Sequence, residues 1–196
     1  MLPIEKRILS RSQYKEWLAY DLKKYPKTKL WWVLELFNVT ESAILRKHIK
    51  LLRKAEFQIN TGKKIGATLT LFRLHILQNK FCLHIPLNCF EKDLKIMHVG
   101  PVLVNPKSCI GQDCSLHIDT AIAAGGLTSN SPVLGNGVVV GVGSKIIGGV
   151  HIANYVAIGA NAVVTKDIIE ENVAVAGVPA KIISNNGALE WNKDKI

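Results

Sequence analysis

The sequence predicts a parallel β-helix built from six-residue repeats, preceded by a basic α-helical region. Three observations predict this arrangement. Aliphatic residues recur at every sixth position over 104–164, apolar residues before residue 80 follow helical spacing, and the positive charge is concentrated in that first part. The fold class is therefore mainly β with an N-terminal helical region.

Residues 1–80 have the spacing of amphipathic helices. Apolar residues recur at intervals of three and four over 10–24, 41–58 and 65–79, and we expect Ser12 to cap the first of these helices. The Tyr25-Pro26 and Thr61-Gly62 pairs are the expected connections. His48 and His75 fall inside these patterns, so we expect them to be structural.

The period of six starts at Val104, and ten of its eleven positions are aliphatic. Those ten are Val104, Ile110, Leu116, Ile122, Leu134, Val140, Ile146, Ile152, Ile158 and Val164. In a β-helix each repeat is a short strand and a turn, and its aliphatic residue points into a narrow interior. The irregular position is Thr128, within 125–131, and the composition of that segment predicts a loop.

Three repeats close one coil, so residues separated by three repeats should stack at about 4.8 Å. We divide the chain into a helical region at 1–80, a β-helix at 81–183 and a C-terminal tail at 184–196. The start of the chain has no apolar run before a cleavage site, and the four cysteines lack zinc-type spacing. We therefore expect reduced cysteines and a cytoplasmic protein.

The charge is divided unevenly along the chain. Residues 1–80 hold 17 Lys and Arg against 6 Asp and Glu, a net charge of +11, whereas residues 81–196 have a net charge of −1. A basic region can attract nucleic acid, an anionic substrate or the anionic inner face of a membrane, or it can simply be a set of solvated helix faces. Because the basic part has no nucleic-acid motif, we do not expect a nucleic-acid partner.

Three segments carry a resemblance to a known family: 96–126, 132–167 and 176–183. Together they resemble the left-handed β-helix hexapeptide acyltransferases, on the serine acetyltransferase-like branch. Segments 51–60 and 85–90 are similar to the N-terminal region of members that acetylate capsular and other surface polysaccharides. The resemblance implies a homotrimer, acetyl-CoA in the groove between neighbouring prisms, and a histidine that acts as general base. It implies no metal.

The resemblance places the catalytic histidine at His98, in Met97-His98-Val99-Gly100. A neutral imidazole can accept a hydroxyl proton at cytosolic pH. His117 lies just over one coil further on, so we expect it almost beneath His98, as a second catalytic candidate. Asp119 is a candidate for binding the acceptor.

The same resemblance implies a cofactor site. Its pantetheine-lining positions fall on Ala124, Val142 and Ala160, which should stack along one edge because each lies three repeats from the next. The candidates for the phosphates of acetyl-CoA are Lys145, Lys166 and Lys181.

The sequence departs from true serine acetyltransferases at two places. Leu83 stands where those enzymes pair an aspartate with the histidine, and Asn130-Ser131 replaces the Arg-His that recognises the substrate carboxylate. A desolvated amino acid needs charged partners, so the losses favour a neutral sugar hydroxyl as acceptor. We therefore expect a polysaccharide O-acetyltransferase, with serine O-acetyltransferase as the alternative.

Several points stay open in the sequence. Glu91, Asp93 or Asp119 could replace the missing aspartate beside His98, or a backbone carbonyl could orient the ring. A non-enzymatic binding role and a carbonic-anhydrase-like metal site are both disfavoured, the latter because only His98 and His117 are placed to converge. If the acceptor is lipid-linked, the basic region could hold the protein at an anionic membrane.

Overall fold

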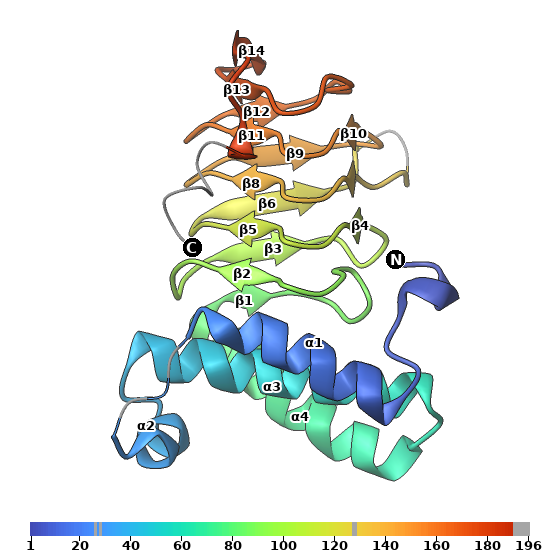
Figure 1. Cartoon of the computed structure of the whole chain (residues 1–196), viewed down its shortest axis with the longest axis vertical. Helices are drawn as coiled ribbons and strands as arrows, with labels where there is room; N and C mark the ends of the chain where they lie inside the picture. The colour runs from blue at the N-terminus through green and yellow to red at the C-terminus, as the bar shows by residue number, and fades with distance from the viewer. Residues whose placement is uncertain (26, 28, 127–128, 190–196) are drawn as a thin grey trace.

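The computed structural model describes residues 1–25, 27, 29–126 and 129–189. Four helices lie across one end of a three-sided stack of short strands (Figure 1). The chain thus has the predicted fold class, with the helical region followed by a β-helix.

The helical end consists of α1 (Arg11–Lys23), α2 (Trp31–Phe37), α3 (Glu41–Asn60) and α4 (Lys64–Phe81). The expected cap at Ser12 is wrong, because Ser10 caps α1. Its hydroxyl accepts a hydrogen bond from the backbone of Gln13 at 3.2 Å, and the Gln13 side chain accepts one from the backbone of Ser10. Among the described residues, no helix is long and apolar enough to cross a membrane.

The strands form three sheets. The five-stranded sheet contains β1 (Leu83–His84), β3 (Val102–Val104), β6 (Thr120–Ala123), β9 (Lys145–Ile147) and β12 (Val163–Val164). The three-stranded sheet contains β4 (Cys109–Ile110), β7 (Val133–Leu134) and β10 (His151–Ile152). The six-stranded sheet contains β2 (Lys95–Ile96), β5 (Ser115–Leu116), β8 (Val139–Val140), β11 (Ala157–Ile158), β13 (Ala174–Ala176) and β14 (Lys181–Ser184).

The interior of the stack is the predicted one. All ten aliphatic residues of the six-residue period are buried, each with 3% or less of its surface exposed. Thr128, the irregular position, lies outside the described residues. All strand pairs are parallel except the last, in which β14 runs antiparallel to β13.

The coils differ in length, which the period alone does not show. Val140 pairs with Ile158, which is the expected three repeats away. Leu116 pairs with Val140, four repeats away, because the segment around 125–131 adds a further repeat to that coil. Ile96 pairs with Leu116, slightly more than three repeats away. Val104 pairs with Ile122 at three repeats, so the stacking expected from a uniform coil fails only at the first coil and at the coil that contains 125–131.

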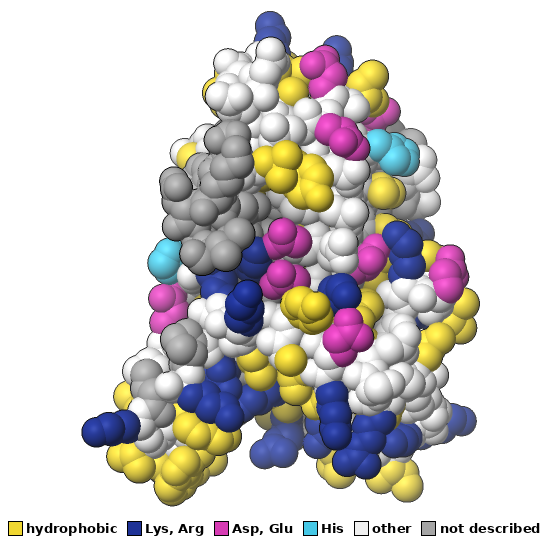
Figure 2. Space-filling view, in the orientation of Figure 1, with side chains coloured by type: hydrophobic (Ala, Val, Ile, Leu, Met, Phe, Trp, Pro, Cys, Tyr) yellow, Lys and Arg dark blue, Asp and Glu magenta, His cyan; other side chains and the backbone are white. Residues whose placement is uncertain are grey.

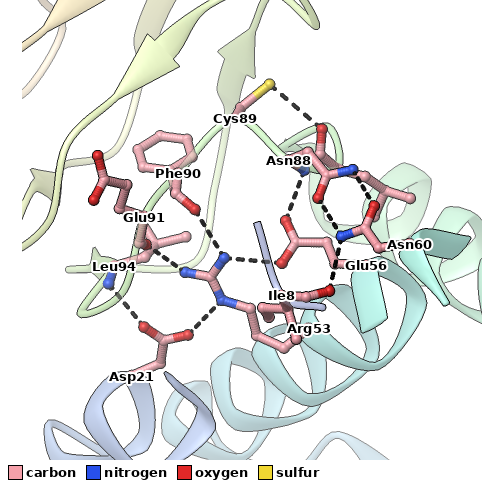
Figure 3. A network of polar contacts seen from close by, with 11 residues as sticks. Ile8, Asp21, Arg53, Glu56, Asn60, Asn88, Cys89, Phe90, Glu91 and Leu94 are labelled. Atoms are coloured by element: carbon pink, nitrogen blue, oxygen red, sulfur yellow. Dashed lines mark hydrogen bonds and ion pairs between the residues drawn. The ribbon is translucent and has the colours of Figure 1, made fainter. Parts of the chain in front are cut away.

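Arg53 of α3 joins the helices to the β-helix through a buried polar network (Figure 3). Its guanidinium donates to Asp21 of α1 at 2.6 Å, to Glu56 at 2.9 Å, and to two backbone carbonyls that precede β2. Asp21 also accepts from the backbone of Leu94 at 2.9 Å. Because both carboxylates and the guanidinium have partners, the network tolerates complete burial.

Tyr25 makes a second connection. Its hydroxyl donates to the carbonyl of Ile96 at 2.6 Å and accepts from the same residue's backbone N–H at 2.7 Å, which satisfies β2 at its outer edge. Burial raises the pKa of Tyr25. One hydrophobic core runs without a break from Leu45 and Leu74 to Val175.

The end of the described chain returns to the β-helix. The backbone N–H of Ala188 donates to the carbonyl of Tyr155 at 2.7 Å, and Ala188 is fully buried. Part of the expected tail at 184–196 therefore packs on the prism. The division into 1–80, 81–183 and 184–196 stays a prediction.

Candidate active site

His98 lies just after β2, where the chain turns the corner of the prism toward β3. The turn brings Gly100 against the next coil: its φ is 153°, and a Cβ on it would lie 2.3 Å from Cδ1 of Ile118. A Cβ there would displace the Ile118 side chain, and the positive φ also favours glycine. The Met97-His98-Val99-Gly100 segment thus holds an exposed imidazole on a closely packed turn.

Glu41, the first residue of α3, contacts this turn. Its Oε2 lies 3.3 Å from Nδ1 of His98, and its Oε1 accepts a hydrogen bond from the backbone N–H of Val99 at 2.7 Å. The second bond fixes the carboxylate relative to the backbone that carries the ring. A histidine that donates from Nδ1 to a carboxylate keeps Nε2 free to accept a proton.

The three carboxylates suggested by the sequence have other partners. Glu91 accepts from Lys6 at 2.8 Å, Asp93 lies 4.0 Å from Lys95, and Asp119 lies 3.5 Å from Lys145. Desolvation raises the pKa of Asp93. Glu41 is therefore the carboxylate that contacts and orients the His98 ring. Glu91, Asp93 and Asp119 do not do so in the described structure.

Leu83 occupies the position of the missing aspartate. It is fully buried in β1 and pairs with Val102 of β3. Sequence reasoning missed Glu41 because it precedes His98 by 57 residues and belongs to the helical part, where no motif marks it.

His117 lies one register position from the partner of His98, on the side opposite to the one that a coil of three repeats would give. Because the first coil is slightly longer than three repeats, β2 and β5 pair Ile96 with Leu116, and His117 therefore follows in register with Met97. It still borders the site, since its register partner is the neighbour of His98.

His117 lies at a groove of about 470 Å³ along the six-stranded sheet. Val142 and Ala160 line the same groove, and the β8–β11 pairing places them three repeats apart in register, as predicted. Small and aliphatic residues make most of its wall. The lining residues are His117, Val139, Gly141, Val142, Ala157, Ile158, Gly159, Ala160, Ala174, Val175, Ile183, Asn186 and Gly187.

Ala124 does not join this stack, which corrects the prediction. It directly follows β6, where Ala123 pairs with Ile147 of the five-stranded sheet. Val142 and Ala160 instead follow strands of the six-stranded sheet. The longer coil separates them, since its extra repeat moves Ala124 to another edge.

The three lysines occupy different surroundings. Lys145 of β9 donates to the carbonyl of Gly143 at 3.1 Å and also contacts Asp119, so two predicted site residues bind each other. Lys166 and Lys181 are exposed. Lys181 begins β14, the strand whose Ile183 lines the groove.

The remaining histidines have other surroundings. His48 is fully buried in α3, while His75, His84 and His151 are exposed, and His151 lies 3.9 Å from Asp167. Within residues 1–25, 27, 29–126 and 129–189, no group of three or more His, Cys, Asp or Glu side chains is arranged to hold a metal.

Comparison with known proteins finds serine acetyltransferases, although no protein-family model matches the chain. The chain is 29% identical over 154 residues to the enzyme of Buchnera aphidicola, covering 75% of the chain and 54% of that protein. It is 36% identical over 93 residues to the enzyme of Haemophilus influenzae, covering 46% and 34%. The chain thus spans about half or less of these relatives.

Solved structures match a larger share of the chain. A serine acetyltransferase in complex with CoA has a TM-score of 0.63 and 22% identity, covering 88% of this chain and 71% of that one. The Neisseria gonorrhoeae serine acetyltransferase in complex with serine has a TM-score of 0.64 and 21% identity, covering 89% and 71%. The chain has the fold of these serine acetyltransferases, an N-terminal helical region followed by a β-helix.

Proposed function

We propose that the chain is an acetyl-CoA-dependent O-acetyltransferase in which His98 is the general base. The observation that carries the proposal is the contact between Glu41 and His98 beside the groove that begins at His117. The relatives named above are serine acetyltransferases, and one solved neighbour is a complex with CoA.

The chemistry follows from the geometry of the ring. With Nδ1–H donated to Glu41, Nε2 of His98 takes the proton of an acceptor hydroxyl, and the oxygen attacks the thioester carbonyl. The C–S bond breaks, and the protonated His98 returns the proton to the departing thiolate. The carboxylate of Glu41 stabilises the imidazolium between these steps. Transfer is direct, with no covalent enzyme intermediate.

The groove supplies a place for the pantetheine arm. Val142 and Ala160 form a slim wall on which the arm lies, and His117 stands at the end near Met97 and His98. Lys166 and Lys181 remain the proposed phosphate partners because both are exposed cations. Lys145, in the five-stranded sheet, pairs with Asp119, and Asp119 is the proposed contact for the acceptor.

A homotrimer completes the proposed site. Leu103 and Ile147 leave apolar side chains exposed on the five-stranded sheet, as does Val142 at the groove. A neighbouring prism would cover these side chains. Sedimentation equilibrium at several protein concentrations tests this, and a monomer at all of them would contradict it.

Serine is the acceptor that the comparisons favour, and polysaccharide acetylation has no support from them. A sugar hydroxyl remains the second candidate on one specific ground. The buried Leu83 and the Asn130-Ser131 pair offer no charge for an ammonium or a carboxylate. Glu41 supplies one carboxylate from elsewhere, which weakens that ground.

The deciding experiment measures CoA thiol release from acetyl-CoA with serine, sugars and oligosaccharides as separate acceptors. Wild type and His98→Ala are compared, and we expect at least a roughly hundredfold loss of turnover in the variant. The exposed His151→Ala is the matched control and should keep activity. Turnover that survives in His98→Ala would remove His98 from the mechanism.

A further inference from the structure

Helix α4 is apolar on two opposite sides. One side packs on α3 through buried residues such as Leu74 and Leu77. The other side carries a second row at helical spacing, Ile65, Leu69, Phe72 and Ile76, and each of these is between 54% and 84% exposed. A helix that is apolar on both sides needs a partner for each, so the outer row indicates an interaction surface.

Apolar side chains are exposed on α2 as well, where Leu36 and Phe37 lie at the end of the helix. Lys47 of α3 contacts that end, since its Nζ donates to Asn38 at 3.1 Å and to the carbonyl of Leu36 at 3.4 Å. We call this surface the basal face: Ile65, Leu69, Phe72, Arg73, Ile76 and Lys80 of α4 with Leu36, Phe37 and Lys47.

The charged residues that define the basal face, Lys47, Arg73 and Lys80, are all cations. Residues 57–90 contain no Asp or Glu, but they contain Lys63, Lys64, Arg73 and Lys80. The neighbouring acid on α2, Glu35, is paired with Arg46 at 2.8 Å and with Lys50 at 2.6 Å. Burial together with the neighbouring Arg73 lowers the pKa of Lys47. Figure 2 shows Lys, Arg and hydrophobic side chains gathered at the helical end, and the Asp and Glu side chains of this view above them.

We infer that the basal face docks on an anionic lipid bilayer. Apolar side chains that alternate with cations fit the boundary between acyl chains and acidic headgroups, where the apolar groups enter and the cations meet phosphate. A second copy of the same face is a poor occupant. A two-fold contact would place Arg73, Lys80 and Lys47 opposite equal charges.

The position of the face suits this role. The helices lie across one end of the prism, and β2 and β3 lie in the stack of strands on one side of them (Figure 1). His98 lies in the turn between these two strands. Docking through α4 would therefore leave the groove and His98 uncovered. The inference goes beyond the proposed acetyl transfer and does not depend on which acceptor is used.

The test is flotation of the full chain with lipid vesicles, and it needs no activity measurement. We expect binding to phosphatidylcholine vesicles that contain about one quarter phosphatidylglycerol, little binding to phosphatidylcholine alone, and loss of binding at high salt. Equal binding to both vesicles, or to neither, would overturn the inference.

Two pairs of variants locate the surface. The double variant Leu69→Ser with Phe72→Ser should weaken partitioning about tenfold or more. Ile169→Ser should not, although Ile169, which follows β12, is even more exposed. Arg73→Glu with Lys80→Glu should weaken binding to anionic vesicles, and Lys107→Glu should have little effect.

Sedimentation velocity on the same variants checks the competing occupant. The inference expects the Leu69 and Phe72 double variant to keep the wild-type oligomeric state and circular dichroism while it loses vesicle binding. A variant that changes oligomeric state and binds vesicles like wild type would assign the face to another copy of the chain.

Discussion

Glu41 places one carboxylate oxygen 3.3 Å from Nδ1 of His98, although the two residues come from a helix and from a turn of the β-helix. The other oxygen is bonded to the backbone of Val99. The helical region thus contributes to the corner that we propose as the active site. The proposed reaction therefore depends on how the helices pack against the β-helix.

Replacing Glu41 should slow the chemical step without affecting acetyl-CoA binding. Glu41→Gln keeps the shape and an acceptor for Val99 but removes the charge that stabilises the imidazolium, so we expect kcat to fall about tenfold, a modest figure because the pair is partly exposed. Glu41→Asp should retain more activity than Glu41→Gln. Steady-state kinetics with an unchanged KM for acetyl-CoA check this.

Glu16→Gln is the control for that prediction, since Glu16 pairs with Lys92 at the surface of α1 at 2.9 Å, as another exposed ion pair. It should leave kcat as in wild type. A Glu41→Gln enzyme with wild-type kcat would show that the carboxylate has no part in the reaction.

Arg53→Met should destabilise the fold strongly. The substitution leaves the buried carboxylates of Asp21 and Glu56 without their guanidinium, and a broken buried pair costs about 3–5 kcal/mol. Urea unfolding at fixed protein concentration measures the change. Lys92→Met breaks only the exposed pair with Glu16 and should cost no more than about 1 kcal/mol. Equal effects of the two substitutions would contradict the role given to the network.

His48 should make the protein less stable in acid. Burial lowers the pKa of His48 to about 4. Between about pH 6.5, the value in the unfolded chain, and pH 4, the unfolded state binds a proton that the folded state does not. The free energy of unfolding therefore decreases as the pH falls through this window, by roughly 3 kcal/mol in total.

His48→Leu should remove that part of the pH dependence. Urea unfolding of both proteins at pH 8 and at pH 5 gives the comparison. If the difference in the free energy of unfolding between wild type and His48→Leu is the same at pH 8 and at pH 5, His48 is not the group responsible.

Filling the groove should weaken acetyl-CoA binding. Ala160→Phe places a ring where the slim wall runs beside Val142, so we expect KM for acetyl-CoA to rise about tenfold or more. Ala19→Phe, an exposed position on α1, is the control and should leave KM unchanged. A variant at Ala160 with wild-type KM would place the cofactor elsewhere.

The sequence predicts the interior of the β-helix because one physical rule repeats. Ile110, Leu116 and Ile146 each have to enter the same narrow interior, so they are all aliphatic and lie on the same six-residue period. The sequence does not predict which residues stack on one another, since the stacking depends on the length of each coil. Ala124 lies on another edge than expected for this reason, because the coil that contains 125–131 has an extra repeat. The slightly longer first coil moves His117 to the other side of the partner of His98.

The helical region is less predictable. The helices α1, α3 and α4 were expected, while α2, with seven residues, is too short for its spacing to be recognised. The contact of Glu41 with His98 has no periodic signal, because it depends on the tertiary packing of α3 against the prism. The same holds for Tyr25, whose hydroxyl hydrogen-bonds to the backbone of Ile96 at the edge of β2, although the two residues are 71 positions apart in the sequence.

The antiparallel pairing of β14 with β13 has a consequence for assembly. The strand edges of one molecule's last coil could serve as a template for the first coil of the next molecule and start a fibre. Reversing the chain at β14 interrupts that template in the six-stranded sheet, and α3 and α4 cover the opposite end (Figure 1). Head-to-tail polymerisation through that sheet is thereby disfavoured.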